Sequence, residues 1–470
     1  MRTVPAPALA PVLVPVLGRA MRLSSLALVA LVATPTTALD NGVGLTPIMG
    51  FDAWYAFYDA APRNKGHNCG GMFFNCPGCF NYSLALVQTA EVMVKDGYKD
   101  AGYRVVAPSD GSAGWFTDGR GPNGEYRVDN GSWPGGVPQV QAFSDWLHDK
   151  MGLQFGWYSS RSDETCCLRI ASCGFEEQDA VQFAKWRVDY LFHDSCGSPN
   201  SARIGNSCTA HPTDTPIQLY GRMAQALNKT GYRTYLKAGW PSQEASDPRN
   251  KVFDVPQRGA VANDWRLGRD DGHGIEVLKM CWDIAAPLWP YAGPGQWNDP
   301  GMLVGHMRHG QEYGMTEAQT RTQFNMAAIL PAQLMIGIDI RNVSDYMRET
   351  LLNHEAIAVN QDKNGIAGRC WVAVGSHVKG PGPAYRVWGR PLADGSVAIV
   401  AANYEAEPAT ITCEGACFAQ SNFSATDALV LRDLWTQDEQ SVQNGKLVFA
   451  NVPGNATSVL VTLRRKTYVV

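Results

Sequence analysis

The chain has 470 residues, and its 40 basic and 44 acidic side chains give a net charge of −4 at neutral pH. A chain of this length buries a large core and holds more than one domain. The slight acidity, without any run of basic residues, excludes a nucleic-acid-binding protein and a protein held on membranes by a polybasic face.

The first 38 residues are predicted to be a signal peptide. They contain three arginines, no acidic residue, an apolar run at 26–32 and the small residues Thr36-Thr37-Ala38. Met21 is an alternative start, because 21–38 has all three parts by itself. A membrane anchor is the competing interpretation, but the apolar run is shorter than the roughly 20 residues that a bilayer requires, and no later segment is long and apolar enough. We therefore expect a secreted protein, or one sent to a vacuole or lysosome-like compartment.

Removal of this segment lowers the net charge from −4 to −7 and leaves twelve cysteines in an exported chain. Such cysteines favour disulfides over metal ligands. The cluster Cys69, Cys76 and Cys79 contains a single CxxC, so no metal site is assigned to it. Six Asn-x-Ser/Thr sequons predict a glycoprotein. They begin at Asn81, Asn130, Asn228, Asn342, Asn422 and Asn455.

Between about residues 45 and 340, short apolar runs alternate with amphipathic stretches. The strand-like runs are 103–107, 153–158, 188–192, 234–237 and 334–338, and the helical patterns are 84–96, 140–150, 176–186, 217–227 and 275–282. Repeated strand–helix alternation predicts a parallel sheet with helical crossovers. Over about 300 residues a closed (β/α)8 TIM barrel, placed at 39–364, is favoured over an open sheet. No GxGxxG follows the first strand, so a dinucleotide-binding fold fits less well.

After about residue 365 the pattern changes to short strands separated by Gly, Pro, Asn and Asp, with no helical stretch between them. The strand candidates are 385–388, 397–402, 409–412, 429–433, 447–449 and 458–463. They predict an antiparallel β-sandwich domain over 365–470. Cys413 and Cys417 lie four residues apart on a predicted turn, and they can close a small disulfide loop.

Catalytic groups of a TIM barrel stand at the C-terminal ends of its strands, so polar residues that close an apolar run are the candidates. Asp194 ends a buried run, although capping of a following helix explains it equally well. The segment 263–271 carries two arginines and three aspartates, among them Asp270. By itself that composition is typical of a solvated loop. Asp299 closes another candidate strand.

Two carboxyl groups at the rim of a barrel are the catalytic groups that a retaining glycosidase needs. A retaining glycosidase places them about 5 Å apart, so that one attacks the anomeric carbon and the other protonates the leaving oxygen. The first must stay ionised, which a nearby arginine or tyrosine hydroxyl favours, and the second must keep its proton. A barrel permits Asp194 and Asp270 to meet in this way, but their spacing alone does not establish it.

At these residues the chain resembles glycoside hydrolase family 27, the α-galactosidases and α-N-acetylgalactosaminidases. The likeness begins at Leu39 and covers, in order, 39–42, 45–50, 156–159, 190–196, 265–270, 297–302, 356–362 and 413–417. So many segments in the same order are specific for the family. The resemblance implies Asp194 as nucleophile and Asp270 as acid/base, without a metal or organic cofactor.

The resemblance also implies the sugar-binding shell. Its positions are Phe51, Asp110, Tyr158, Phe192, Gly239, Ser242, Arg266 and Met302. Tyr158 is expected near the nucleophile and Arg266 against the sugar. A disulfide beside the nucleophile is expected between Cys196 and either Cys166 or Cys167, whereas the partners of the cysteines at 69–79 stay open.

Several shell positions differ from the family. Ser109-Asp110 stands in place of two adjacent acids that hold the galactose 4- and 6-hydroxyls, Phe192 replaces a lysine, Phe51 a tryptophan, Gly301 an acid, and Gly239 a glutamate. A site that hydrogen-bonds a hydroxyl discriminates strongly, so each loss affects specificity. Gly239 and Ser242 are small enough to admit a larger 2-substituent or another sugar.

We therefore expect a secreted retaining exo-glycosidase that acts on terminal α-D-galactosyl residues of an oligosaccharide or other glycoside. The alternatives are an enzyme of the same family that acts on α-N-acetylgalactosaminides, β-L-arabinopyranosides or isomaltose-type linkages, a transglycosidase, and a sugar-binding protein without turnover. The retained carboxyls oppose the last alternative. The oligomeric state is not predicted.

Overall fold

The computed structural model describes residues 39, 41–57, 82–114, 118–196, 208–239, 258–268, 274–305, 315–375 and 384–466. Within them, the first eight strands form one parallel sheet in the order β7-β6-β5-β4-β3-β2-β1-β8. These strands are β1 (Met49–Asp52), β2 (Val105–Ala107), β3 (Gln154–Ser160), β4 (Val188–Asp194), β5 (Tyr235–Ala238), β6 (Asp264–Arg266), β7 (Trp297–Asp299) and β8 (Leu334–Ile336).

The sheet closes on itself beyond the end of β7. The amide of Leu303 donates to the Met335 carbonyl at 2.8 Å, and the amide of Gly337 donates to the Leu303 carbonyl at 2.8 Å. Together with the parallel pairing of every neighbouring strand, this closure confirms the predicted TIM barrel. All eight C-terminal strand ends therefore face one rim.

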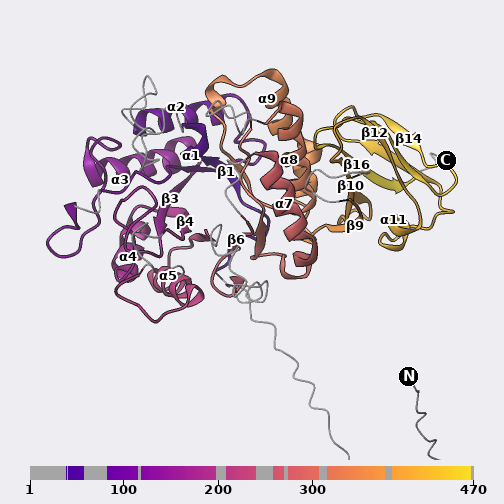
Figure 1. The fold of residues 1–470 in the computed structure, drawn as a ribbon. Helices are drawn as coiled ribbons and strands as arrows, with labels where there is room; N and C mark the ends of the chain where they lie inside the picture. The colour runs from indigo at the N-terminus through magenta and orange to yellow at the C-terminus, as the bar shows by residue number, and fades with distance from the viewer. Residues whose placement is uncertain are drawn as a thin grey trace, which may run out of the picture. The chain divides into compact units, whose positions relative to one another are not determined.

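Helices connect the strands on the outside of the sheet (Figure 1). They are α1 (Ala53–Ala56), α2 (Tyr82–Lys95), α3 (Gly136–Trp146) with a π-helical continuation η2 (Leu147–Met151), α4 (Glu176–Lys185), α5 (Pro216–Thr230), α7 (Ile275–Ala285), the 3-10 helix η6 (Ala286–Tyr291), α8 (Glu317–Ile329), the 3-10 helix η7 (Ile340–Asn342), α9 (Asp345–Leu352) and α10 (His354–Asn360). The five predicted helical patterns fall on α2, α3, α4, α5 and α7.

Local sequence explains where these helices start and stop. The Thr215 side chain accepts a hydrogen bond from the Gln218 backbone amide, and Gln218 Oε1 accepts one from the Thr215 backbone amide. These two bonds form a capping box at the start of α5, where Pro216 is the first helical residue. Gly231 ends α5 in the left-handed conformation at φ 74°. Thr316 and Gln319 cap α8 in the same way.

Buried aromatic rings fill the space between the sheet and its helices. Trp157 of β3 lies 4.9 Å from Trp186 and 6.2 Å from Tyr126, measured between ring centroids. Because side chains alternate along a strand, Trp157 faces the helices while Tyr158 faces the opposite way, into the barrel. Packing on the outer face therefore fixes which β3 side chains reach the barrel interior.

The chain changes after α10 to antiparallel strands, shown in orange to yellow in Figure 1. They are β9 (Arg369–Val374), β10 (Tyr385–Pro391), β11 (Val397–Asn403), β12 (Ala409–Cys413), β13 (Leu429–Asp433), β14 (Glu439–Ser441), β15 (Leu447–Val452) and β16 (Thr457–Arg465). They form a six-stranded and a two-stranded sheet, with a shared core that includes Ile399, Ile411 and Phe449.

The prediction of a segment without helices was wrong at one place. A short helix, α11 (Gly415–Ala419), follows β12, so Cys413 ends a strand and Cys417 lies in a helix instead of both lying on a turn. The two are nevertheless disulfide-bonded. None of the helices in the described ranges combines the length and apolar character that a membrane crossing demands.

Candidate active site

Asp194 is the last residue of β4 and stands at the C-terminal rim of the barrel. The Tyr158 hydroxyl donates to Asp194 Oδ2 at 2.5 Å, and the Ser195 amide donates to Asp194 Oδ1 at 2.7 Å. Both donors favour the ionised carboxylate. The residues at 197–207, where a helix capped by Asp194 would begin, lie outside the described residues, so the helix-cap interpretation stays an alternative.

The pairing of β3 with β4 brings these groups together. Tyr158 is opposite Phe192, and Ser160 is opposite Asp194. The Tyr158 and Phe192 rings meet edge to face, with centroids 5.2 Å apart. The barrel interior beside Asp194 is therefore aromatic at the position where the family carries a lysine.

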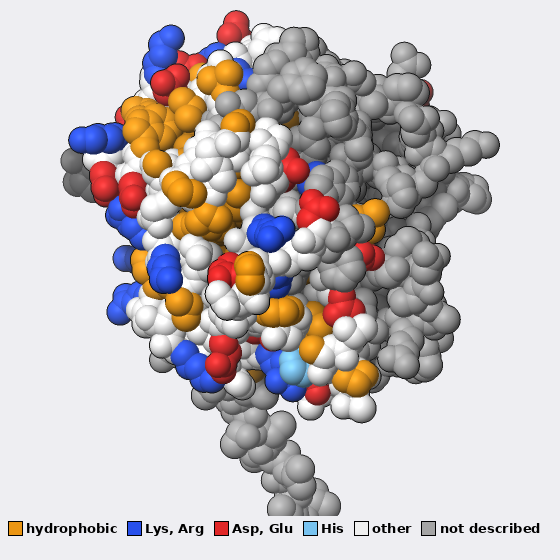
Figure 2. Space-filling model, turned by 90° about the vertical axis from the view of Figure 1, so that its left-hand side faces the viewer, with side chains coloured by type: hydrophobic (Ala, Val, Ile, Leu, Met, Phe, Trp, Pro, Cys, Tyr) orange, Lys and Arg blue, Asp and Glu red, His pale blue; other side chains and the backbone are white. Residues whose placement is uncertain are grey.

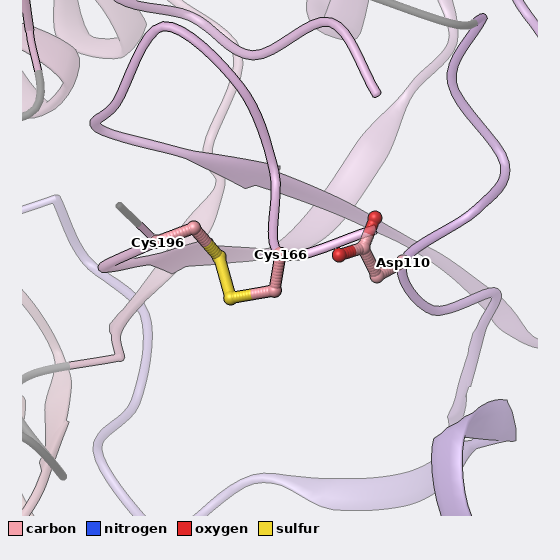
Figure 3. Close-up of side chains that lie close together, drawn as sticks. All are labelled: Asp110, Cys166 and Cys196. Carbon is pink, nitrogen blue, oxygen red and sulfur yellow. A yellow bond between two sulfur atoms is a disulfide. The ribbon is translucent and has the colours of Figure 1, made fainter. Parts of the chain in front are cut away.

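A disulfide-bonded cysteine, Cys196, lies two residues after Asp194. Cys196 is bonded to Cys166, one of the two predicted partners, and Cys167 forms a separate disulfide. Figure 3 shows this bridge beside Asp110, whose carboxylate lies within 4.8 Å of both sulfur atoms. The bridge therefore joins the segment after Asp194 to the loop that contacts Asp110.

Asp110 is almost fully buried and its carboxylate holds the same loop. Oδ1 accepts from the Thr165 hydroxyl at 2.6 Å and from the Gly111 amide at 2.8 Å, and Oδ2 accepts from the Cys167 amide at 2.8 Å. Burial raises the pKa of Asp110 to about 6 against the lowering effect of these bonds, and the charge of Asp194 adds to the rise. A carboxylate with three protein donors has less capacity left for sugar hydroxyls than the sequence implied.

Gly239 follows β5 and lies against Asp194. A Cβ atom added to Gly239 would stand 2.1 Å from Asp194 Oδ1. The space that the missing side chain leaves is thus filled by the carboxylate itself. The expectation that Gly239 and Ser242 admit a larger 2-substituent stays a prediction, because the segment 240–257 lies outside the described residues.

The barrel interior contains a buried group of charges around Lys237, a residue that was not among the predicted site residues. Lys237 of β5 is fully buried; its ammonium donates to Asp299 and lies 3.9 Å from Asp264 Oδ1. Asp299 also lies 3.9 Å from Arg266 Nε. Lys237 is opposite Phe192 across β4 and β5, and its ammonium lies 5.1 Å from the centre of that ring. A lysine at the end of the predicted strand-like run 234–237 was the available signal.

These groups shift one another's protonation. Burial raises the pKa of Asp264 to about 7, even though the charge of Lys237 lowers it. Burial opposes ionisation of Asp299 as well, but the charges of Lys237 and Arg266 outweigh it and hold the pKa of Asp299 below its usual value. Asp299 is therefore the ionised partner of Lys237 and Arg266, whereas Asp264 is harder to ionise.

The structure describes only some of the remaining predicted shell residues. Phe51 is fully buried in β1, and Met302 is buried behind β7, where its carbonyl accepts from Gln323 Nε2 at 2.5 Å. Asp270 and Ser242 lie outside the described residues, so the distance between the two predicted catalytic carboxyls is not part of this site's geometry.

Three groups of side chains have the proximity of metal ligands in the described ranges, and each includes at least one cysteine. The cysteines concerned are Cys166, Cys173, Cys196 and Cys208, which form the Cys166–Cys196 and Cys173–Cys208 disulfides. A disulfide sulfur is not a thiolate and does not offer the ligand that such a site requires. These groups therefore do not fit a metal centre.

Comparison with known proteins finds a family match for each of the two parts of this architecture. The family described as alpha galactosidase A matches residues 46–362, and a family described as the alpha-galactosidase C-terminal β-sandwich domain matches 382–462, on either side of the predicted boundary. An α-galactosidase from Cyamopsis tetragonoloba is 30% identical over 431 residues, which cover 91% of this chain and 88% of that protein.

Solved structures share the fold. An α-galactosidase from Saccharomyces cerevisiae has a TM-score of 0.72 at 23% identity, with 91% of this chain and 99% of that chain covered. A family 27 β-L-arabinopyranosidase from Geobacillus stearothermophilus has a TM-score of 0.67 at 18% identity, with 89% of this chain and 96% of that chain covered.

Proposed function

Because the chain belongs to the melibiase family of α-galactosidases, glycoside hydrolase family 27, we propose that it releases terminal α-D-galactosyl residues with retention of configuration. One observation carries the proposal. Asp194 stands at the C-terminal rim with its carboxylate held by the Tyr158 hydroxyl and the Ser195 amide. Two donors to the charged form keep a carboxylate available as a nucleophile.

The reaction proceeds in two displacements. Asp194 attacks the anomeric carbon while the glycosidic bond breaks and Asp270 gives its proton to the leaving oxygen. Asp270 then takes a proton from water, whose oxygen attacks the anomeric carbon and releases Asp194. The role of Asp270 rests on the resemblance of 265–270 to the family's acid/base segment.

Hydrolysis of aryl α-galactosides tests this function. We expect activity that Asp194→Ala removes, with α-galactose as the first product in a proton NMR time course. A β-configured first product would exclude the retaining mechanism. Binding of galactosides without turnover by the unmodified protein would instead support a sugar-binding role.

A β-L-arabinopyranosidase is the second candidate, and a specific observation favours it. Ser109 stands where the family has the first of two acids, and the carboxylate of Asp110 is already bonded to Thr165, Gly111 and Cys167. Fewer acceptors are thus left for the 4- and 6-hydroxyls of galactose, and an arabinopyranoside has no C6 hydroxymethyl group. A kcat/KM at least 10-fold higher for the aryl β-L-arabinopyranoside than for the α-galactoside would select this activity.

We also propose that the enzyme is exported and glycosylated. The five sequons that lie in the described ranges have exposed asparagines: Asn130, Asn228, Asn342, Asn422 and Asn455. On the face shown in Figure 2, basic and acidic side chains of the described residues are interspersed, which suits a neutral sugar better than a polyanion. N-terminal sequencing of the secreted protein and a mass shift with peptide N-glycosidase test export and glycosylation.

A further inference from the structure

The rims of β4 and β5 approach each other closely at Asp194. The last paired residues are His193 and Ala238, and the amide of Gly239 donates to the His193 carbonyl at 2.9 Å. Asp194 and Gly239 are thus neighbours beyond the last pair. Neighbouring strands are normally about 4.8 Å apart, which leaves room for a Cβ on each.

Gly239 has no such room. A Cβ atom there would lie 2.1 Å from Asp194 Oδ1 and 2.8 Å from both Cα and Cγ of Asp194, all within the 3.0 Å that real Cβ atoms essentially never cross. Gly239 is not one of the described glycines with positive φ. Glycine is therefore required at residue 239 because Asp194 leaves no space for a Cβ, and not because the backbone there adopts a left-handed conformation.

Two hydrogen bonds also hold the carboxylate. Tyr158 of β3 bonds Oδ2 at 2.5 Å, and the Ser195 amide bonds Oδ1 at 2.7 Å. Oδ1 is thus the oxygen that lies over Gly239. A methyl group at residue 239 would push Oδ1 away from the Ser195 amide, and a shift of about 1 Å in a reacting group costs about 100-fold in rate.

We propose that Gly239 is a positioning residue for Asp194: the absent side chain is the space in which the nucleophile carboxylate rests. The inference depends on the proposed function for its kinetic consequence, but not for its structural one. It also means that a glutamate cannot be restored at residue 239 without moving Asp194.

Gly239→Ala tests the kinetic consequence. We expect kcat on the preferred aryl glycoside to fall at least 100-fold, while KM changes less than about 3-fold, because the sugar still binds but the nucleophile is displaced. Gly368→Ala is the matched control: its Cβ would stand 2.4 Å from the Ile329 carbonyl oxygen at the end of α8. That variant should lose thermal stability with kcat unchanged. A Gly239→Ala enzyme with kcat within 3-fold of the original overturns the proposal.

A thermal cycle tests the structural consequence without any substrate. Gly239→Ala is compared in the original protein and in the Asp194→Gly background, where no carboxylate occupies the space. We expect the fall in Tm caused by Gly239→Ala to be clearly smaller in the second background. Equal falls in both overturn the proposal, as does a double variant that fails to fold when Asp194→Gly alone folds. If the original protein hydrolyses no glycoside, the proposed function fails while this cycle still decides the role of Gly239.

Discussion

The Tyr158 hydroxyl donates to Oδ2 of Asp194, the candidate nucleophile, at 2.5 Å. Tyr158→Phe removes this donor and leaves the ring. We expect kcat/KM to fall about 10- to 100-fold, since a hydrogen bond to a charged group contributes about 1.5–3 kcal/mol. Steady-state kinetics on the preferred glycoside measures the loss.

Tyr126→Phe is the control for this substitution. Its hydroxyl accepts from Trp157 Nε1 at 3.3 Å, on the outer face of β3. That variant should keep kcat/KM. If both variants behave alike, Tyr158 has no particular influence on the nucleophile.

Lys237 is the residue whose loss should affect stability most. Lys237→Met leaves Asp299 and Asp264 buried with less compensating charge. Breaking a buried ion pair costs about 3–5 kcal/mol, so the midpoint of urea unfolding should fall sharply. Lys229→Met, which removes an exposed partner of Glu177, should change it little. A small effect at residue 237 would mean that water or other groups compensate the aspartates.

Some residues of the site could be identified from the sequence, whereas contacts between residues of different strands could not. Asp194 and Tyr158 were identified from motifs, because the family keeps both at fixed spacing. Lys237 was not, since nothing in the sequence says that the lysine of one strand lies opposite Phe192 of the next. Two of the three donors to Asp110 come from 165–167, over fifty residues away along the chain, so the hydrogen bonds of Asp110 to that loop could not be predicted from the sequence either.

At the scale of elements, the end of β4 is fixed by the Cys166–Cys196 disulfide, which closes a separation of 30 residues. Replacing both cysteines by alanine should reduce stability by about 3–4 kcal/mol on the loop-entropy model. Because Cys196 is two residues after Asp194, we also expect lower kcat. Urea unfolding and kinetics of the folded variant measure the two effects.

The Cys413–Cys417 bridge offers the matched control, because it joins the end of β12 to α11 with a separation of only four residues. Its double alanine variant should cost less stability and leave kcat unchanged. Equal kinetic losses for the two pairs would show that the bridge beside Asp194 has no special effect on the site.

The elements themselves were predicted unevenly. The predicted run 429–433 coincides with β13, and long amphipathic patterns such as that of α5 were found because the apolar period of a helix extends over many residues. β6 has three residues, Asp264–Arg266, two of them charged. Its composition alone is typical of a solvated loop, and only the resemblance to the family marked the segment as part of a site, since it is the barrel interior that gives these charges their partners.

For the molecule as a whole, buried titratable groups predict a stability that rises in mild acid. Asp110 and Asp264 have folded-state pKa values raised to about 6 and about 7 by burial. Between these values and the usual carboxyl pKa of about 4, the folded protein binds more protons than the unfolded chain. Stability from these two groups therefore increases as pH falls through that window.

His148 acts in the same direction. Burial lowers the pKa of its imidazole, but the hydrogen bond and charge of Asp189, 2.7 Å from Nε2, outweigh burial and raise it overall. Its stabilising contribution is present below the unfolded pKa and is lost as pH rises through the folded pKa. Burial lowers the pKa of His193 to about 3, so this imidazole opposes the gain as pH falls below its usual pKa of about 6.5. We expect Asp110, Asp264 and His148 together to outweigh it and to give a higher Tm at pH 5 than at pH 8 by differential scanning calorimetry. Asp264→Asn should narrow the difference, and a Tm that is higher at pH 8 would contradict the prediction.

The sequence by itself determined the barrel with its C-terminal sheets, the family and the position of Asp194, because apolar periodicity and motif spacing are local properties that survive in a single chain. Tertiary structure decided what surrounds that carboxylate: the loop held by Asp110, the lysine opposite Phe192, and the glycine over which Oδ1 rests. Those relations join side chains from different strands. Strand pairing sets them, and no spacing along the chain encodes the distance between two strands at the rim of a closed barrel.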